Sequence, residues 1–408
     1  MRARLTNTWH SPQRWVILLA ATGAIAGLSA AIFLLVKVYR AATPQTPSAF
    51  YTPPAPLPPG PPGTLIRQEP LPSSLPEGAQ AWRVMYISTD LAGNPIAVTG
   101  TVVAPAGPSP QPRPVIAWAH GTTGIRPECG VSHTRDPYQQ TPAIERMLAE
   151  GFVVTITDYP GLGTPGLHPY MVGPVAAQSV LDSVRAARQL DSVNAGERLV
   201  VWGASQGGNS ALWTAQVAAD YAPELTLLGA AASAPALDLR GIAEFNLDQP
   251  AGGIFLGLVF AAWAAVYPEA DLDAIIKPEE RANFERITAP CFTAAAGFLR
   301  VRDSFRTPEQ YLSVDILTTE PWPTLFEENT PRDPIAVPLL IAHGTADPLI
   351  PIVLSEAEVA RRCARGEVVQ LARYPGSSHD AREDTALHIL GWVVDRFADR
   401  PAASTCAG

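Results

Sequence analysis

Residues 203–207 read Gly-Ala-Ser-Gln-Gly and carry the clearest chemical signal in this sequence. An apolar run precedes them and a helical pattern follows. A serine on a sharp turn between a strand and a helix stands clear of its sheet, where a base can activate it and backbone N–H groups can stabilise a developing oxyanion. The small residues Gly203 and Gly207 allow such a strained turn to close. Ser205 is therefore the candidate nucleophile for acyl transfer.

An acyl-transfer serine needs a histidine base and an acid that orients the imidazole, and after this kind of turn they follow in the order serine, acid, histidine. Three histidines follow Ser205: His343 at a predicted strand end, His388 inside a predicted helix, and His379 in a Gly/Ser-rich loop. The loop leaves His379 free to reach over the sheet, so we predict that it is the base. Asp347, in the turn after the preceding predicted strand, is the predicted acid.

The oxyanion needs two N–H donors near the serine. The backbone N–H of Gln206 is one predicted donor, because it directly follows the nucleophile in the turn. Residues 120–124, His-Gly-Thr-Thr-Gly, follow another predicted strand and have the form of a second donor loop. Thr122 is the predicted second donor, with its hydroxyl as a possible extra one, and His120 is predicted to be structural.

Extended and helical patterns alternate through the chain beyond residue 78, which favours a mostly parallel sheet covered on both faces. Eight strands are predicted, at residues 82–89, 96–104, 115–119, 152–157, 198–202, 225–232, 337–342 and 368–374. Helices are predicted at residues 143–150, 174–190, 208–221, 352–365 and 381–399. With the serine after the fifth strand, this is the element order of an α/β-hydrolase fold.

Between the sixth and seventh predicted strands, residues 238–336 are mainly helical in pattern and are predicted to form a cap over the serine. Residues 253–267 are the most apolar part of the cap and are too short to cross a bilayer. The apolar face of this segment either packs as ordinary core or lines a pocket for an acyl chain. Both interpretations stay open, because a buried helix and a lipid-binding helix have similar sequences.

The first 78 residues differ in composition from the rest. Residues 15–36 form an uncharged apolar run that would reach about 33 Å as a helix, enough to cross a bilayer. We predict an uncleaved membrane anchor within residues 1–40, with the remainder exported; the alternative is a signal peptide cleaved near residues 29–31 and free secretion. Residues 41–78 are rich in proline and are predicted to be a disordered spacer before a catalytic domain over residues 79–408.

The net charge of −9 argues against a nucleic-acid partner, because phosphate binding relies on clustered Lys and Arg. The four cysteines, Cys129, Cys291, Cys363 and Cys406, have no spacing typical of a metal site. Export would permit two disulfides, with three possible pairings, whereas four reduced thiols would be the alternative. We predict no metal and no organic cofactor.

In its motifs the chain resembles the secretory lipase family of fungi and actinobacteria. The resemblance covers about residues 79–408 and rests on HGTTG, DYPGLG, GASQGG, HGTADPLIP and PGSSH in this order. It implies an α/β-hydrolase with a helical cap, a triad of Ser205, Asp347 and His379, and hydrolysis of carboxylic esters, including acylglycerols. It also implies that Cys129 pairs with Cys291 and Cys363 with Cys406. The apolar segment and proline-rich stretch depart from secreted members of the family.

The sequence therefore predicts a serine hydrolase that acts on lipid esters through an acyl-enzyme on Ser205. One alternative is a cell-envelope acyltransferase that uses the same residues but passes the acyl group to an alcohol. An alternative of another class is an inactive, anchored binding module with a hydrolase fold.

Overall fold

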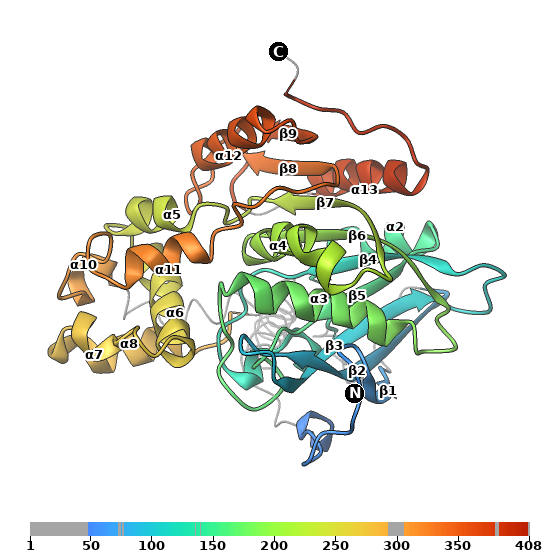
Figure 1. Cartoon of the computed structure of the whole chain (residues 1–408), viewed down its shortest axis with the longest axis horizontal. Helices are drawn as coiled ribbons and strands as arrows, with labels where there is room; N and C mark the ends of the chain where they lie inside the picture. Colours follow the sequence, from blue (N-terminus) through green and yellow to red (C-terminus); the bar gives the residue numbers. More distant parts are fainter. Residues whose placement is uncertain are drawn as a thin grey trace, which may run out of the picture.

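A computed structural model describes residues 48–71, 75, 77–134, 136–138, 140–292, 306–379 and 383–406. Within these residues one nine-stranded sheet runs in the order β1-β2-β3-β5-β4-β6-β7-β8-β9 (Figure 1). The first three pairings of this order are antiparallel and the rest are parallel. The strands are β1 (Leu65–Pro70), β2 (Ala79–Thr89), β3 (Pro95–Pro105), β4 (Arg113–Ala119), β5 (Val153–Thr157), β6 (Ala195–Ala204), β7 (Thr226–Ser233), β8 (Leu339–Gly344) and β9 (Val369–Tyr374).

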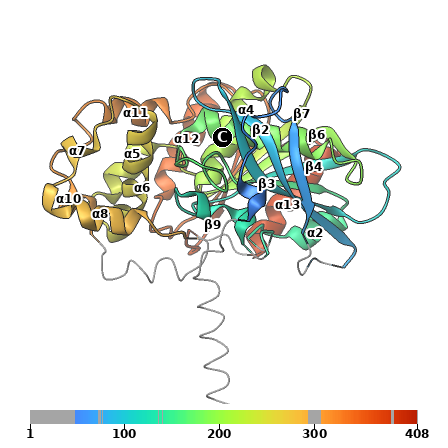
Figure 2. The ribbon, with the colours of Figure 1, turned by 90° about the horizontal axis from the view of Figure 1, so that it is seen from below.

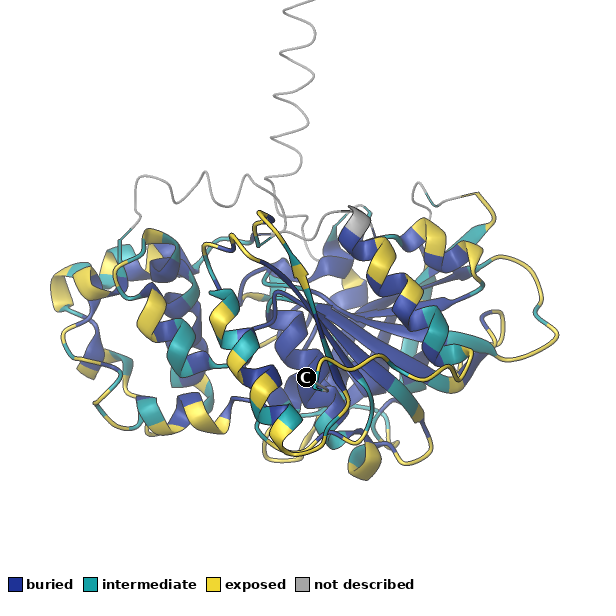
Figure 3. Cartoon of the chain, turned by 90° about the horizontal axis from the view of Figure 1, so that it is seen from above, coloured by how far each residue is buried: buried dark blue, intermediate teal, exposed yellow. Residues whose placement is uncertain are grey.

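Helices cover both faces of the sheet, as the alternation of patterns predicted. Side chains of α3 (Gly173–Ala187), α4 (Gln206–Tyr221) and α12 (Ile352–Ala364) join one apolar core, and those of α2 (Ile144–Ala149) and α13 (Glu383–Phe397) join a core on the opposite face. Successive side chains of the central strand β4 point to opposite faces of the sheet. Val115 and Ala117 belong to the first core, and Ile116 and Trp118 belong to the second. Figure 3 shows the strands buried and the outer helix surfaces exposed. This arrangement is an α/β-hydrolase fold, as predicted.

The prediction of a disordered spacer over residues 41–78 is wrong for the part that the structure describes. Residues 65–70 form β1, which pairs antiparallel with β2 and adds a ninth strand to the eight predicted. Ahead of it, the short 3-10 helix Ala49–Tyr51 buries Phe50 and Tyr51 against Met85 and Ala97. The Arg83 guanidinium lies 5.3 Å from the centre of the Tyr51 ring. The high proline content obscured the few aromatic and strand-forming residues of this stretch. These residues are ordered because they pack on β2 and β3.

The cap forms its own helical layer at one end of the sheet (Figures 1 and 2). Its described helices are α5 (Leu239–Asn246), α6 (Pro250–Val266), α7 (Leu272–Ile275), α8 (Arg281–Thr288), α10 (Pro308–Tyr311) and α11 (Trp322–Glu328). The remaining short helices are of 3-10 type, at Pro127–Cys129, Val131–His133 and Pro278–Glu280. Phe260, Trp263 and Trp322 are among the fully buried side chains of an apolar core that the cap forms together with residues of the loops beneath it, such as Ile125 and Tyr170. The apolar segment predicted at 253–267 is thus α6, and much of it packs as core.

Two disulfides fasten the outer elements, with the pairing that the family resemblance implied. Cys129, in the 3-10 helix after the 120–124 loop, bonds to Cys291, which follows α8 in the cap. Cys363 in α12 bonds to Cys406 near the C-terminus. The first bond therefore ties the cap covalently to the segment directly after the loop that is predicted to hold the oxyanion.

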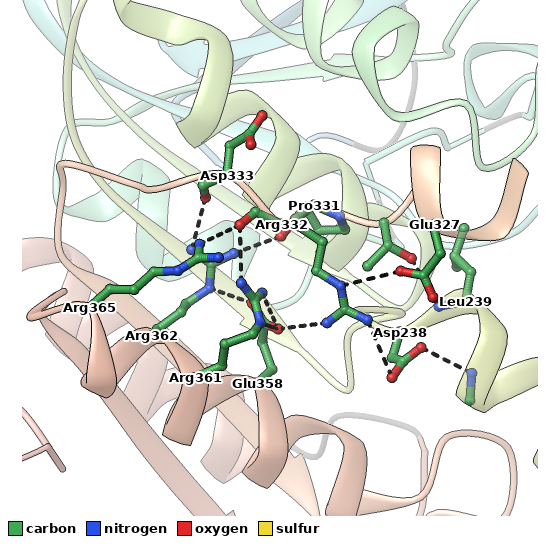
Figure 4. Close-up of polar contacts among 12 residues, drawn as sticks. Asp238, Leu239, Glu327, Pro331, Arg332, Asp333, Glu358, Arg361, Arg362 and Arg365 are labelled. Carbon is green, nitrogen blue, oxygen red and sulfur yellow. Dashed lines mark hydrogen bonds and ion pairs between the residues drawn. The ribbon is translucent and has the colours of Figure 1, made fainter. Parts of the chain in front are cut away.

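A buried charge network attaches both connections of the cap to α12 (Figure 4). The Glu358 carboxylate, 2% exposed, lies between the guanidinium groups of Arg332, Arg361 and Arg362. Arg332 lies 3.5 Å from Asp238, the residue that caps α5 where the cap begins. Arg361 and Arg362 also donate to the backbone oxygens of Arg332 and Pro331, where the chain leaves the cap.

Within the described ranges, no helix is long and apolar enough to span a membrane. The predicted anchor, residues 1–40, lies outside the described residues, as does the start of the predicted spacer.

We expect Glu358→Gln to lower the free energy of unfolding by about 2 kcal/mol or more, because it removes the carboxylate beside Arg361 and one of the two carboxylates, with Glu367, that face the fully buried Arg362. Glu356 on the same helix makes an exposed pair with Arg373, at 2.8 Å. Glu356→Gln should therefore cost less than about 1 kcal/mol and serves as the matched control. Urea unfolding measures both, and equal midpoints for the two variants would contradict an attachment role for Glu358.

Candidate active site

Ser205 lies on a strained turn between β6 and α4, as predicted. Its φ of 56° and ψ of −116° are rarely adopted by a residue with a side chain. The turn needs glycine on both sides: a Cβ on Gly203 would lie 1.9 Å from the Gly207 oxygen, and one on Gly207 would lie 1.8 Å from the Ala119 oxygen. The backbone N–H of Ser205 donates to the oxygen of Ser233 on β7, at 2.9 Å. Close backbone packing with the neighbouring strands therefore holds the serine in this conformation.

A hydrogen bond links the predicted base to the predicted acid in the structure. The Nδ1 of His379, in the loop after β9, lies 2.7 Å from Oδ2 of Asp347, in the turn after β8. The other carboxylate oxygen of Asp347 accepts from the N–H groups of Leu349 and Ile350, at 2.8 and 3.0 Å. Because Nδ1 is bonded to the carboxylate, the Nε2 of a neutral His379 is left as the proton acceptor. Asp380, next in the chain, lies outside the described residues.

A second histidine, His343, also bonds the predicted acid. Its Nε2 lies 3.1 Å from Oδ2 of Asp347 and 3.0 Å from the oxygen of Ile350. Both are acceptors, so Nε2 carries the hydrogen, and Nδ1 accepts from the Ser355 hydroxyl of α12 at 2.8 Å. The sequence placed His343 at a strand end without a role. The spacing of four residues between His343, at the end of β8, and Asp347, in the turn after it, was the signal that could have predicted this contact.

These bonds keep Asp347 ionised. Burial alone would raise the pKa of its carboxyl, but hydrogen bonds from His343 and His379 outweigh burial and hold this pKa well below its ordinary value of 3.8. The carboxylate can therefore stabilise a protonated His379 without taking its proton.

The loop predicted to supply the second oxyanion donor lies beside the serine: a Cβ on Gly121 would be 3.8 Å from the Cβ of Ser205. The Thr122 hydroxyl is within 2.7 Å of the Tyr170 hydroxyl. Gln206 is the first residue of α4, where a helix leaves its N–H groups without partners in the helix. The assignment of the two oxyanion donors stays a prediction.

His168 was missed by the sequence reasoning, although it contacts Gln206 directly. Its Nδ1 lies 2.9 Å from the Pro160 oxygen, and its Nε2 lies 2.8 Å from the side-chain nitrogen of Gln206. The carbonyl fixes the hydrogen on Nδ1, so Nε2 accepts from the amide. Burial lowers the pKa of His168 to about 3, and the ring stays neutral and holds the Gln206 side chain. No motif marks His168, which reaches the turn from a distant loop.

Ser205 and His379 line one narrow cavity between the sheet and the cap. Most of the remaining lining is apolar and comes from the cap, including Leu239, Ile242, Leu256, Val259 and Phe326. Within the described ranges no cluster of three or more His, Cys, Asp or Glu side chains is arranged to hold a metal ion. The arrangement places an activated hydroxyl at the wall of an apolar cavity.

The sheet order, the serine on its strained turn and the histidine–carboxylate pair at two strand ends define an α/β-hydrolase. The chain belongs to the secretory lipase family, whose model matches residues 136–405.

Named relatives agree with this family. Lipase 10 of Candida albicans is 26% identical over 89% of this chain and 83% of its own length. A protein of Mycobacterium tuberculosis described as a probable inactive lipase is 28% identical over 90% of this chain and 85% of its own. Among solved structures, Candida antarctica lipase A in its closed state matches with a TM-score of 0.76 and 18% identity over 90% of each chain. The last comparison bears on the fold alone.

Because the pKa of Asp347 falls on folding, this carboxyl stabilises the protein fully above its unfolded pKa of about 3.8, and the contribution is lost as the pH falls below that value. We expect the free energy of unfolding to differ between the wild type and Asp347→Asn by more at about pH 7 than at about pH 3. Urea unfolding at the two pH values measures this difference. Parallel pH profiles for the two proteins would contradict the bonding described for Asp347.

Proposed function

We propose that this chain is a serine hydrolase of carboxylic esters that cleaves lipid esters such as acylglycerols. One observation carries the proposal: Ser205, on its strained turn, shares an apolar cavity with a histidine whose Nδ1 lies 2.7 Å from a buried carboxylate. Family membership and the names of relatives as lipases support the same class of activity. The fit between the apolar lining and an acyl chain supports lipid esters over short polar ones.

In the proposed mechanism, the Ser205 hydroxyl attacks the ester carbonyl while the Nε2 of His379 takes its proton. Asp347 stabilises the imidazolium that forms, and the N–H groups of Gln206 and Thr122 bind the oxyanion. Collapse of the tetrahedral intermediate breaks the bond to the alcohol oxygen, which takes the proton from His379. Water, deprotonated by the same histidine, then attacks the acyl carbon. The bond to the Ser205 oxygen breaks as His379 returns the proton to that oxygen, and the carboxylic acid leaves. The protein groups named here supply every proton transfer.

We also propose that the enzyme acts outside the cytoplasm. Two disulfides persist best in an oxidising compartment, and the family is described as secretory. Residues 15–36 would hold the enzyme at a membrane if they stay uncleaved; cleavage near residues 29–31 would release it. Cells would express the full-length chain, and a blot of their membrane fraction and of their medium would show which of the two fractions contains the protein. The membrane fraction indicates an anchor, and the medium indicates cleavage and release.

The test is hydrolysis of p-nitrophenyl esters from acetate to palmitate. We expect the full chain to hydrolyse them with a rate that rises with chain length, and Ser205→Ala and His379→Asn to lower kcat by at least about 10⁴-fold. His388 follows the serine too but lies exposed on α13, bonded to Tyr374. His388→Asn is therefore the matched histidine control, expected to stay within about twofold of the wild type.

Activity confined to short esters would make the protein a carboxylesterase. Acyl transfer to an added alcohol that outpaces hydrolysis would favour the acyltransferase alternative. A folded protein without activity on any ester would contradict the proposal and favour a binding module, a possibility that the relative described as inactive makes worth testing.

A further inference from the structure

Asn246 is a polar exception in the lining that the cap contributes to the cavity. The side chains around it from α5, α6 and α11 are apolar, among them Leu239, Ile242, Leu256, Val259 and Phe326. Among the other polar lining residues, Ser205 and His379 belong to the proposed chemistry, and the Tyr170 hydroxyl is bonded to Thr122. Asn246 itself is 4% exposed, so its amide has little contact with solvent.

The orientation of the Asn246 amide is fixed by its neighbours. Its Nδ2 donates to the backbone oxygens of Ile242 and Leu349, each at 2.9 Å. Carbonyl oxygens can only accept, so the nitrogen must face them and the oxygen must point elsewhere. Its Oδ1 is buried and has no hydrogen-bond partner in the structure. Asn246 lines the cavity, so one residue of its wall carries a fixed acceptor without a partner.

A buried amide oxygen without a partner is unfavourable and uncommon in proteins, and it calls for an explanation. A buried water needs two to four polar partners, which the apolar cap residues around Asn246 do not offer. A substrate group that brings its own donor would meet this need. A neutral acceptor in an apolar setting selects a hydroxyl, and it gives no advantage to a plain alkyl chain.

We propose that Asn246 is a specificity residue whose Oδ1 accepts a hydrogen bond from a hydroxyl group of the ester substrate. The inference rests on the proposed function, because it assigns the cavity to the ester. It names the substrate class as hydroxylated lipid esters. The hydroxyl belongs either to the acyl chain, as in a hydroxy fatty acid, or to the alcohol, as in a partial acylglycerol.

The test compares kcat/KM for matched esters on the full-length wild-type protein. In one arm, p-nitrophenyl esters with a hydroxyl at successive positions of the acyl chain are each compared with the unsubstituted ester of equal length. In the other arm, a monoacylglycerol is compared with the propyl ester of the same acid. We expect a preference of roughly tenfold or more for the hydroxylated ester in one arm, which also identifies where the hydroxyl sits.

Asn246→Leu should abolish this preference, because the hydroxyl then enters an apolar cavity without an acceptor. The ratio for a pair of substrates does not depend on how much of a variant is folded, and equal kcat/KM on the wild type alone would already overturn the role of Asn246. Val259→Ala is the matched control: it enlarges the same cavity without changing an acceptor, and the preference should persist.

Equal kcat/KM within each pair on the wild type, with hydrolysis still dependent on Ser205, would overturn the role of Asn246 and leave the proposed function standing. A preference that survives Asn246→Leu would overturn it as well. Failure of the wild type to hydrolyse any ester would overturn both proposals together.

Discussion

The buried carboxylate of Asp347 is the interaction on which the candidate site depends. It bonds His379 and His343 through one oxygen and two backbone N–H groups through the other. An ion at this depth is stable only while these donors surround it. Ser355 of α12 supports His343, and Asn246 of the cap bonds the backbone of the same turn at Leu349. The acid therefore connects two strand ends, a covering helix and the cap.

The helix α12 links the site of the acid to the cap. It carries Ser355, which supports the acid through His343, and Glu358, which holds both connections of the cap. It is in turn fixed to the C-terminal segment by the Cys363–Cys406 disulfide. The helix α12 therefore contributes both to the position of the cap and, through His343 and Asp347, to the orientation of the base. The cavity and the reacting groups are positioned together.

Local patterns made most of the fold predictable. The turn around Ser205 could be recognised because backbone crowding permits only glycine at Gly203 and Gly207. His379 and Asp347 could be found because strand ends bring their loops to one edge of the sheet. His168 and Asn246 could not, since each acts through contacts with a distant segment and no local pattern records them. The ordered β1 was missed for the same reason: its stability comes from β2, against the local evidence of many prolines.

Covalent trapping of Ser205 tests the central claim most directly. The full-length protein would be incubated with a long-chain alkyl phosphonate ester that carries a p-nitrophenyl leaving group, digested, and mapped by mass spectrometry. The account predicts one phosphonyl adduct, on the peptide that contains Ser205, forming much more slowly in His379→Asn. Ester hydrolysis without an adduct at Ser205, or an adduct on a different residue, would contradict it.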